Sequence, residues 1–155
     1  MSFTAGDLKA IAVAGSVAGV LDLADAVVLW GMQGIAPIRV LQSIASGLLG
    51  SKAFSGGVVS AALGVLCHFF IALVAAAIYY FTVKKFSFIN QRAFAAGVVF
   101  GMAVYVFMNS VVLPLSNFGG SIAYTPAGTF AHTLLFGVPI ALIVRKYLRD
   151  AAVGS

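Results

Sequence analysis

Residues 57–83 decide the fold, and they read GVVSAALGVLCHFFIALVAAAIYYFTV. This stretch exceeds the roughly 20 apolar residues that a helix needs to cross about 30 Å of hydrocarbon. Three further stretches of the same character lie at residues 9–33, 93–114 and 126–144. The sequence therefore predicts an all-α, polytopic membrane protein with four transmembrane helices.

Composition argues against a water-soluble domain. The chain of 155 residues is 62% hydrophobic and only 8% charged, whereas a soluble domain carries about a quarter charged residues. The spans and their short connections occupy the chain, so we predict a single transmembrane domain over residues 1–155. The first span contains two aspartates and does not end at a small-residue cleavage site, so we expect it to be retained rather than removed as a signal peptide.

The basic residues predict the orientation. Four spans place the N-terminus, the connection between the second and third spans, and the C-terminus on one side of the membrane. That side holds seven of the nine basic residues: Lys9, Lys84, Lys85, Arg92, Arg145, Lys146 and Arg149, against Arg39 and Lys52 on the other. By the positive-inside rule, both termini should be cytoplasmic. We expect the protein to reside in the cell inner membrane. The net charge of +5 then reflects topology and contact with lipid head groups, and we expect no nucleic-acid partner.

The connection between the first two spans has its own pattern. Over residues 37–50, apolar and polar side chains take opposite faces of a helix: Ile38, Leu41, Ile44, Ala45 and Leu48 against Arg39, Gln42, Ser43 and Ser46. About 14 residues are too few to span the bilayer, so we predict a short helix in the outer interface. It is either an anchor or a lid over polar residues of the spans, lined by Gln42, Ser43 and Ser46.

Five polar residues interrupt the spans at a similar depth. They are Asp22 and Asp25 on the first span, His68 on the second, Asn109 on the third and His132 on the fourth. Counted at 1.5 Å per residue from the cytoplasmic ends, all five lie at roughly 20 to 24 Å. Stripes of glycine and alanine on the same helix faces indicate that these side chains point into the bundle. An ionisable group in hydrocarbon is costly unless it is paired or faces a cavity, so this set is the candidate ion- or proton-binding site.

Two short matches suggest an internal repeat. Asp25-Ala-Val-Val-Leu29 resembles Asn109-Ser-Val-Val-Leu113, and Gly64-x-x-x-His68 resembles Gly128-x-x-x-His132. Both hairpins would run outward and then back, so they would be parallel repeats about an axis along the membrane normal. This pattern predicts that Asp25 superposes on Asn109, and that the two histidines superpose on each other.

Three classes of function fit these features. The first is a small transporter or channel that binds a proton or a metal cation, with Asp25, His68 and His132 as candidate metal ligands. The second is a non-catalytic structural or accessory subunit, in which the polar cluster fixes helix register and glycine-rich faces pack against a second copy or a larger complex. The third is a b-type haem protein ligated by both histidines, although the sequence itself requires no cofactor. Nucleotide-binding, thiol-redox and hydrolase motifs do not occur, so we expect no enzyme.

The last third of the chain resembles a known family. Leu113-Pro114-Leu115, then Ala131-His132 and an apolar stretch through Pro139 to Arg145-Lys146, is similar to the YagU-like small bacterial inner-membrane proteins of largely unassigned function. The resemblance implies four spans in the inner membrane and a connection with envelope or acid stress. The chain departs from that family by lacking a longer, more polar external connection between the first two spans.

Overall fold

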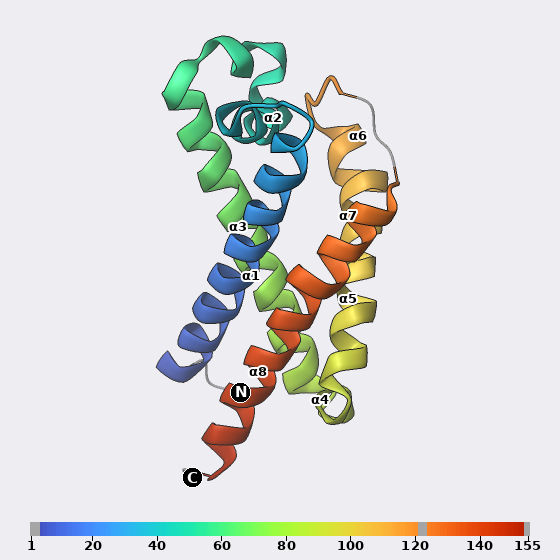
Figure 1. Cartoon of the computed structure of the whole chain (residues 1–155). Helices are drawn as coiled ribbons and strands as arrows, with labels where there is room; N and C mark the ends of the chain where they lie inside the picture. Colours follow the sequence, from blue (N-terminus) through green and yellow to red (C-terminus); the bar gives the residue numbers. More distant parts are fainter. Residues whose placement is uncertain (1–3, 121–123, 154–155) are drawn as a thin grey trace.

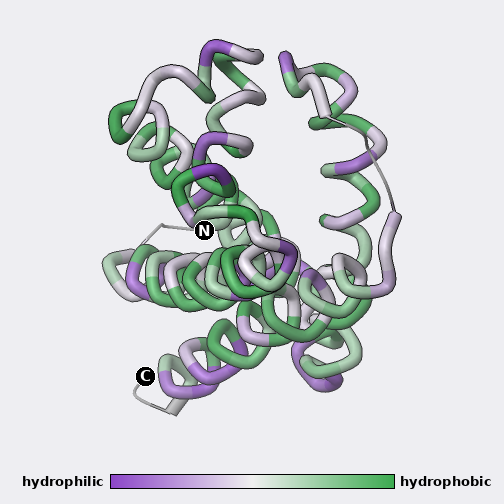
Figure 2. Tube along the Cα trace, turned by 45° about the horizontal axis from the view of Figure 1, so that its top comes forward, coloured by the Kyte–Doolittle hydropathy of each residue, from purple (hydrophilic) through white to green (hydrophobic). Residues whose placement is uncertain are grey.

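The computed structural model describes residues 4–120 and 124–153, and all the regular secondary structure within them is helical (Figure 1). Four helices or runs of helices are long and apolar enough to cross a membrane, which confirms the four predicted spans: Ala5–Gly31, Gly57–Lys85, Ala93–Leu115 and Pro126–Ala152. The first span is helix α1 (Ala5–Gly31) and the second is α3 (Gly57–Lys85). Hydrophobic residues follow these helices along most of their length (Figure 2).

The third and fourth spans are each built from three consecutive pieces. The third consists of α5 (Ala93–Phe107), the π-helical turn η2 (Met108–Val112) and α6 (Leu113–Leu115). The fourth consists of α7 (Pro126–Phe130), the π-helical turn η3 (Ala131–Gly137) and α8 (Val138–Val153). The last helix therefore continues beyond the predicted boundary at residue 144.

The two π-helical turns have a common sequence cause. Each ends two residues before a proline: η2 before Pro114 and η3 before Pro139. A proline in a helix lacks the backbone N–H, and its ring clashes with the carbonyl four residues earlier. Widening the preceding turn from four to five residues moves that carbonyl away from the ring, so the helix continues without a break.

Short helices connect the spans. α2 (Pro37–Leu49) confirms the helix predicted over residues 37–50, with Pro37 in its first turn and Gly50 at φ 59° as its C-cap. The 3₁₀ turn η1 (Gly50–Ser55) leads from α2 into α3, and α4 (Phe88–Gln91) joins α3 to α5. The buried face of α2 is mixed, since Gln42 and Ser46 are buried together with Val40 and Ala45, while Ile38 and Leu48 are exposed. Exposed apolar side chains are compatible with a helix lying at a membrane interface.

α1 and the last span lie in the middle of the bundle. α3 packs along α1, and α5 packs along η3 and α8. Fully buried alanines lie at these contacts, among them Ala14, Ala72 and Ala141. α1 begins and α8 ends at the same end of the bundle, which we call the termini end, and α2 lies at the opposite end, the α2 end (Figure 1). This arrangement agrees with both termini being on one side of the membrane.

Glycines allow the helices to approach closely. A Cβ on Gly101 would overlap the carbonyl of His132, and a Cβ on Gly137 would overlap the carbonyl of Gly97. The same substitution at Gly64 would run into the backbone of α2. Backbone contact of this kind is typical of helix packing in lipid, where small residues rather than large apolar ones form the interface.

The internal repeat remains a prediction. Gly19 and Gly101 each end a G-x-x-x-G pair, and each lies beside a histidine of the next span along the chain. Matching these two glycines sets Asn109 opposite Val27 instead of Asp25. The helix contacts therefore favour a register two residues away from the one that the sequence matches suggest.

Candidate functional site

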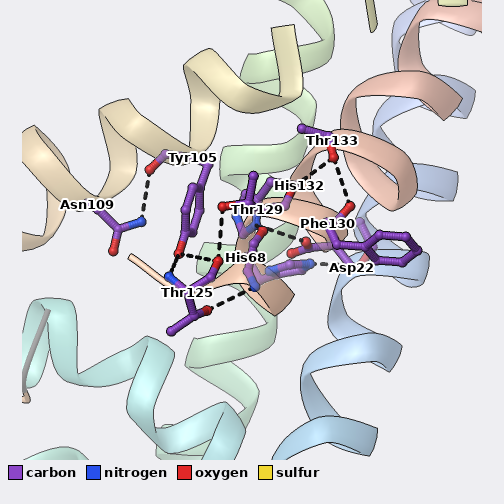
Figure 3. Close-up of polar contacts among 11 residues, drawn as sticks. Asp22, His68, Tyr105, Asn109, Thr125, Thr129, Phe130, His132 and Thr133 are labelled. Atoms are coloured by element: carbon purple, nitrogen blue, oxygen red, sulfur yellow. Dashed lines mark hydrogen bonds and ion pairs between the residues drawn. The ribbon is translucent and has the colours of Figure 1, made fainter. Parts of the chain in front are cut away.

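Asp22 of α1, in the first hairpin, and His132 of η3, in the second hairpin, face each other where the two hairpins meet (Figure 3). Asp22 Oδ1 and His132 Nδ1 are 3.8 Å apart, and the side chains are 15% and 26% exposed. His132 Nδ1 also lies 3.0 Å from the carbonyl oxygen of Gly128, to which its N–H donates. The carboxylate is then in electrostatic rather than hydrogen-bond contact, and the ring has its Nε2 left to hold a second proton. Protonation of this imidazole would strengthen the attraction to Asp22.

Tyr105 supports His132 from the neighbouring helix α5. The two ring centroids are 5.0 Å apart. The Tyr105 hydroxyl accepts a hydrogen bond from the backbone N–H of Thr125 at 2.8 Å, and the Thr125 hydroxyl in turn accepts from the N–H of Gly128 at 3.0 Å (Figure 3). Thr125 is the N-cap of α7, so the phenol of one helix and the hydroxyl of the next fix the turn that carries the Gly128 carbonyl. The Tyr105 ring and the Gly128 carbonyl together therefore fix the position of His132.

His68 is oriented by α1. Its Nε2 lies 2.8 Å from the carbonyl oxygen of Gly19, so the ring N–H donates to a backbone acceptor one turn before Asp22. The ring stands edge-on to Phe69, with centroids 5.4 Å apart. This bond joins the two helices of the first hairpin at the level where Gly19 packs closely against α3. His68 therefore lies on α3 close to the helix that carries Asp22, but its contact is with the backbone.

Asp25 and Asn109 differ in how they are satisfied. Asp25 lies one turn beyond Asp22, is half-buried, and makes no hydrogen bond within the described residues. Asn109 donates its amide N–H to the carbonyl of Tyr105 in its own helix at 2.9 Å. Of the five predicted residues, the structure brings Asp22 and His132 together, with Asp25 on the adjoining turn. Asn109 bonds its own helix and lies in the π-helical turn η2.

The predicted metal ligands do not form a metal site. Within residues 4–120 and 124–153, no group of three or more histidine, cysteine, aspartate or glutamate side chains could hold an ion. His68, one of the three predicted ligands, bonds the Gly19 carbonyl, and ligation by Asp25, His68 and His132 remains a prediction. The same bond occupies the Nε2 of His68, so this histidine does not fit the predicted ligation of a shared haem through that nitrogen.

The polar residues of α2 bond locally. The Gln42 amide donates to the carbonyl of Gly57 at 3.0 Å and accepts from Arg39 at 3.4 Å. Ser43 donates to the carbonyl of Val40, and Ser46 to that of Ser43. None of these bonds reaches the polar residues of the spans. The Gln42 bond joins α2 to the start of α3, while an anchor in the interface and a lid lined by these three side chains both remain predictions.

A second polar group, which the polarity of the spans does not predict, lies at the termini end. Asp7 is 6% exposed and accepts hydrogen bonds from the Tyr80 hydroxyl and, at 2.8 Å, from Lys84 Nζ. Thr4 and Asp7 also form a reciprocal capping box at the start of α1. The pattern Thr4-x-x-Asp7 before an apolar run is the signal that could have predicted it. This group ties the beginning of α1 to the end of α3 and is fully satisfied.

No protein-family model, curated protein or solved structure matches the chain. The described residues form a small bundle with four spans long and apolar enough to cross a membrane, and one ion pair joins its two hairpins. The similarity to YagU-like proteins remains a prediction.

Proposed function

We propose that this protein binds and releases protons within the membrane, as a small transporter or channel of the cell inner membrane with both termini cytoplasmic. The observation that carries the proposal is the contact of Asp22 with His132 at 3.8 Å, between two hairpins that lie side by side. Ionisable side chains inside transmembrane segments are costly, and proton and ion pathways are where they occur.

Asp25 adds a second carboxyl group to this pair, and the three side chains together form a site that can bind and release a proton. Asp22 and Asp25 are three residues apart on one helix, so their carboxyl groups are neighbours. Two carboxylates at that distance repel each other when both are ionised, and binding one proton or one monovalent cation removes the repulsion. Because Asp25 has no hydrogen bond among the described residues, it is the group of this site whose proton is least restrained, and Asp22 and His132 place a carboxylate and an imidazole nearby.

Proton flux into proteoliposomes tests the proposal. The wild-type protein should carry a proton current above that of empty vesicles when a membrane potential is imposed. Asp25→Asn and His132→Gln should each reduce this current at least about tenfold, because each removes one of the groups that change charge. Asn109→Ala serves as the matched control, since Asn109 lies at a comparable depth but bonds its own helix. Equal currents in wild type and empty vesicles would overturn the proposal.

The second candidate function is that of a structural or accessory membrane subunit. The observation that favours it is that His68 and Asn109 are satisfied by backbone carbonyls, as expected of groups that join helices or complete one. Under this alternative, Asp22→Asn and His132→Gln should change only the melting temperature of the purified protein. A flux that depends on Asp25 is the result that separates the two functions.

A further inference from the structure

The end of α8 presents a basic groove on the side that faces away from the bundle. The groove has a volume of about 420 Å³ and is lined by Leu142, Arg145, Lys146, Arg149 and Asp150. These positions recur at helical spacing, so they share one face of α8. On the opposite face, Ala141 and Val144 are buried in the core. Hydrophilic residues are concentrated on this last part of the chain (Figure 2).

The cations of this groove are available to a ligand. Both ion pairs of the described residues lie elsewhere: Lys84 with Asp7, and His132 with Asp22. Lys146 and Arg149 are exposed, and Arg145 is half-buried. Basic residues near a helix C-terminus also complement the helix dipole, but that effect needs no groove. Three cations that no ion pair of the described residues engages, side by side along one open groove, instead match the phosphate group of an anionic ligand.

Leu142 indicates where the ligand comes from. It lies one turn before the basic residues, is 43% exposed, and continues the apolar surface of the fourth span. A phosphate held by Arg145 and Arg149 would therefore have apolar surface directly beside it on the membrane side. A free phosphate ion gains nothing from that surface, whereas the acyl chain of a lipid packs on it. We infer that this groove binds the head group of an anionic phospholipid in the leaflet at the termini end.

The binding of phosphatidylglycerol to the purified full-length protein in neutral detergent tests this inference. Wild type should bind phosphatidylglycerol at least about tenfold more tightly than phosphatidylcholine, since basic residues near an anionic surface act additively. R145Q/K146Q/R149Q should weaken that binding by about tenfold or more. Asp150→Asn should strengthen it by about twofold, because it removes the one carboxylate of the groove. A gain in affinity is not produced by misfolding, so this second variant keeps the test valid if the triple variant is unstable.

The matched control removes the same charge elsewhere. Lys9, Lys52 and Lys85 are exposed and lie outside the groove, so K9Q/K52Q/K85Q should change the affinity less than about threefold. Equal losses in the two triple variants would show that only net charge matters, and would overturn the inference. Displacement of the lipid by millimolar inorganic phosphate would also overturn it, since the groove would then be a site for the free ion. None of these readouts depends on proton flux, so the result is independent of the function proposed above.

Discussion

Gly47 of α2 and Ser116, just beyond α6, face each other at the α2 end: a Cβ placed on Gly47 would lie 3.8 Å from the Cβ of Ser116. The adjoining residue completes the contact. The backbone N–H and the side-chain amide of Asn117 donate to the carbonyls of Gly47 and Leu48, each at 2.9 Å. These bonds satisfy carbonyls that the last turn of a helix leaves without an intrahelical partner. The second hairpin thus holds the short helix that follows the first span.

This geometry predicts a disulfide between the two hairpins. A Cβ–Cβ separation near 3.8 Å is the mean for natural disulfides. Gly47→Cys with Ser116→Cys should therefore oxidise spontaneously in a Cys67→Ala background, which removes the one native cysteine. Mass spectrometry of the unreduced protein measures the bond. Gly31→Cys with Ser116→Cys is the control, since a Cβ on Gly31 has nothing within 4 Å; a bond in this control alone would contradict the contact.

Close packing at Gly101 predicts a large loss of stability on adding one methyl group. Gly101→Ala places a Cβ against the carbonyl of His132, and backbone on both sides leaves little room to relax. We expect a destabilisation of about 3 kcal/mol, at the upper end of ordinary overpacking. Gly31→Ala makes the same change in open space and should be neutral or slightly stabilising. Thermal unfolding in detergent compares the two; similar melting temperatures would mean that α5 and η3 are further apart than described.

The polar group at the termini end predicts that the loss of Lys84 lowers the free energy of unfolding more than the loss of Lys85. Lys84→Met leaves the Asp7 carboxylate without its cation, and it should cost about 2 kcal/mol. This value is below that of a fully buried pair, because the Lys84 side chain is 21% exposed. Lys85→Met removes the same charge one position along, where the side chain is exposed, and should change stability by less than about 0.5 kcal/mol. Urea unfolding monitored by circular dichroism distinguishes the two variants.

The charge asymmetry predicts which ends of the helices are accessible from each side of the cell membrane. In the Cys67→Ala background, Ser87→Cys should react with a membrane-impermeant maleimide only after cell lysis, because it lies at the termini end. Asn117→Cys at the α2 end should react in intact cells. Both positions are exposed in the structure, so a lack of reaction reports the membrane and not burial. The opposite labelling pattern would place both termini outside.

Most of the fold follows from simple sequence patterns. Apolar length predicts the four spans, and proline, glycine and helical periodicity predict α2 almost to the residue. The π-helical turns were not predicted, although Pro114 and Pro139 were visible in the sequence. A proline signals a disturbed helix, but whether the chain kinks or gains a residue per turn depends on packing against the neighbouring helix. That packing is not visible in a local pattern.

The candidate site could be predicted only in part, for a related reason. Polarity and depth in the membrane predict Asp22, Asp25, His68 and His132 as site residues. They do not predict which group each side chain contacts, because that depends on how the helices pack. The Gly19 carbonyl, which His68 meets, carries no sequence signal, since every residue has a carbonyl. Asp7 does not stand out in this way because it precedes the first lysine of the apolar run, where an acidic residue is ordinarily solvent-exposed, yet it is buried.

The Asn117 contact also bears on the order of assembly during synthesis. α2 leaves the ribosome with the first hairpin, but Asn117, which bonds its last carbonyls, lies 69 positions after Leu48. The carbonyls of Gly47 and Leu48 therefore lack these partners until the third span has crossed the membrane. A ribosome stalled before that point should present a first hairpin whose α2 is exposed to proteases, and protection of this segment would then mark the moment at which the second hairpin docks.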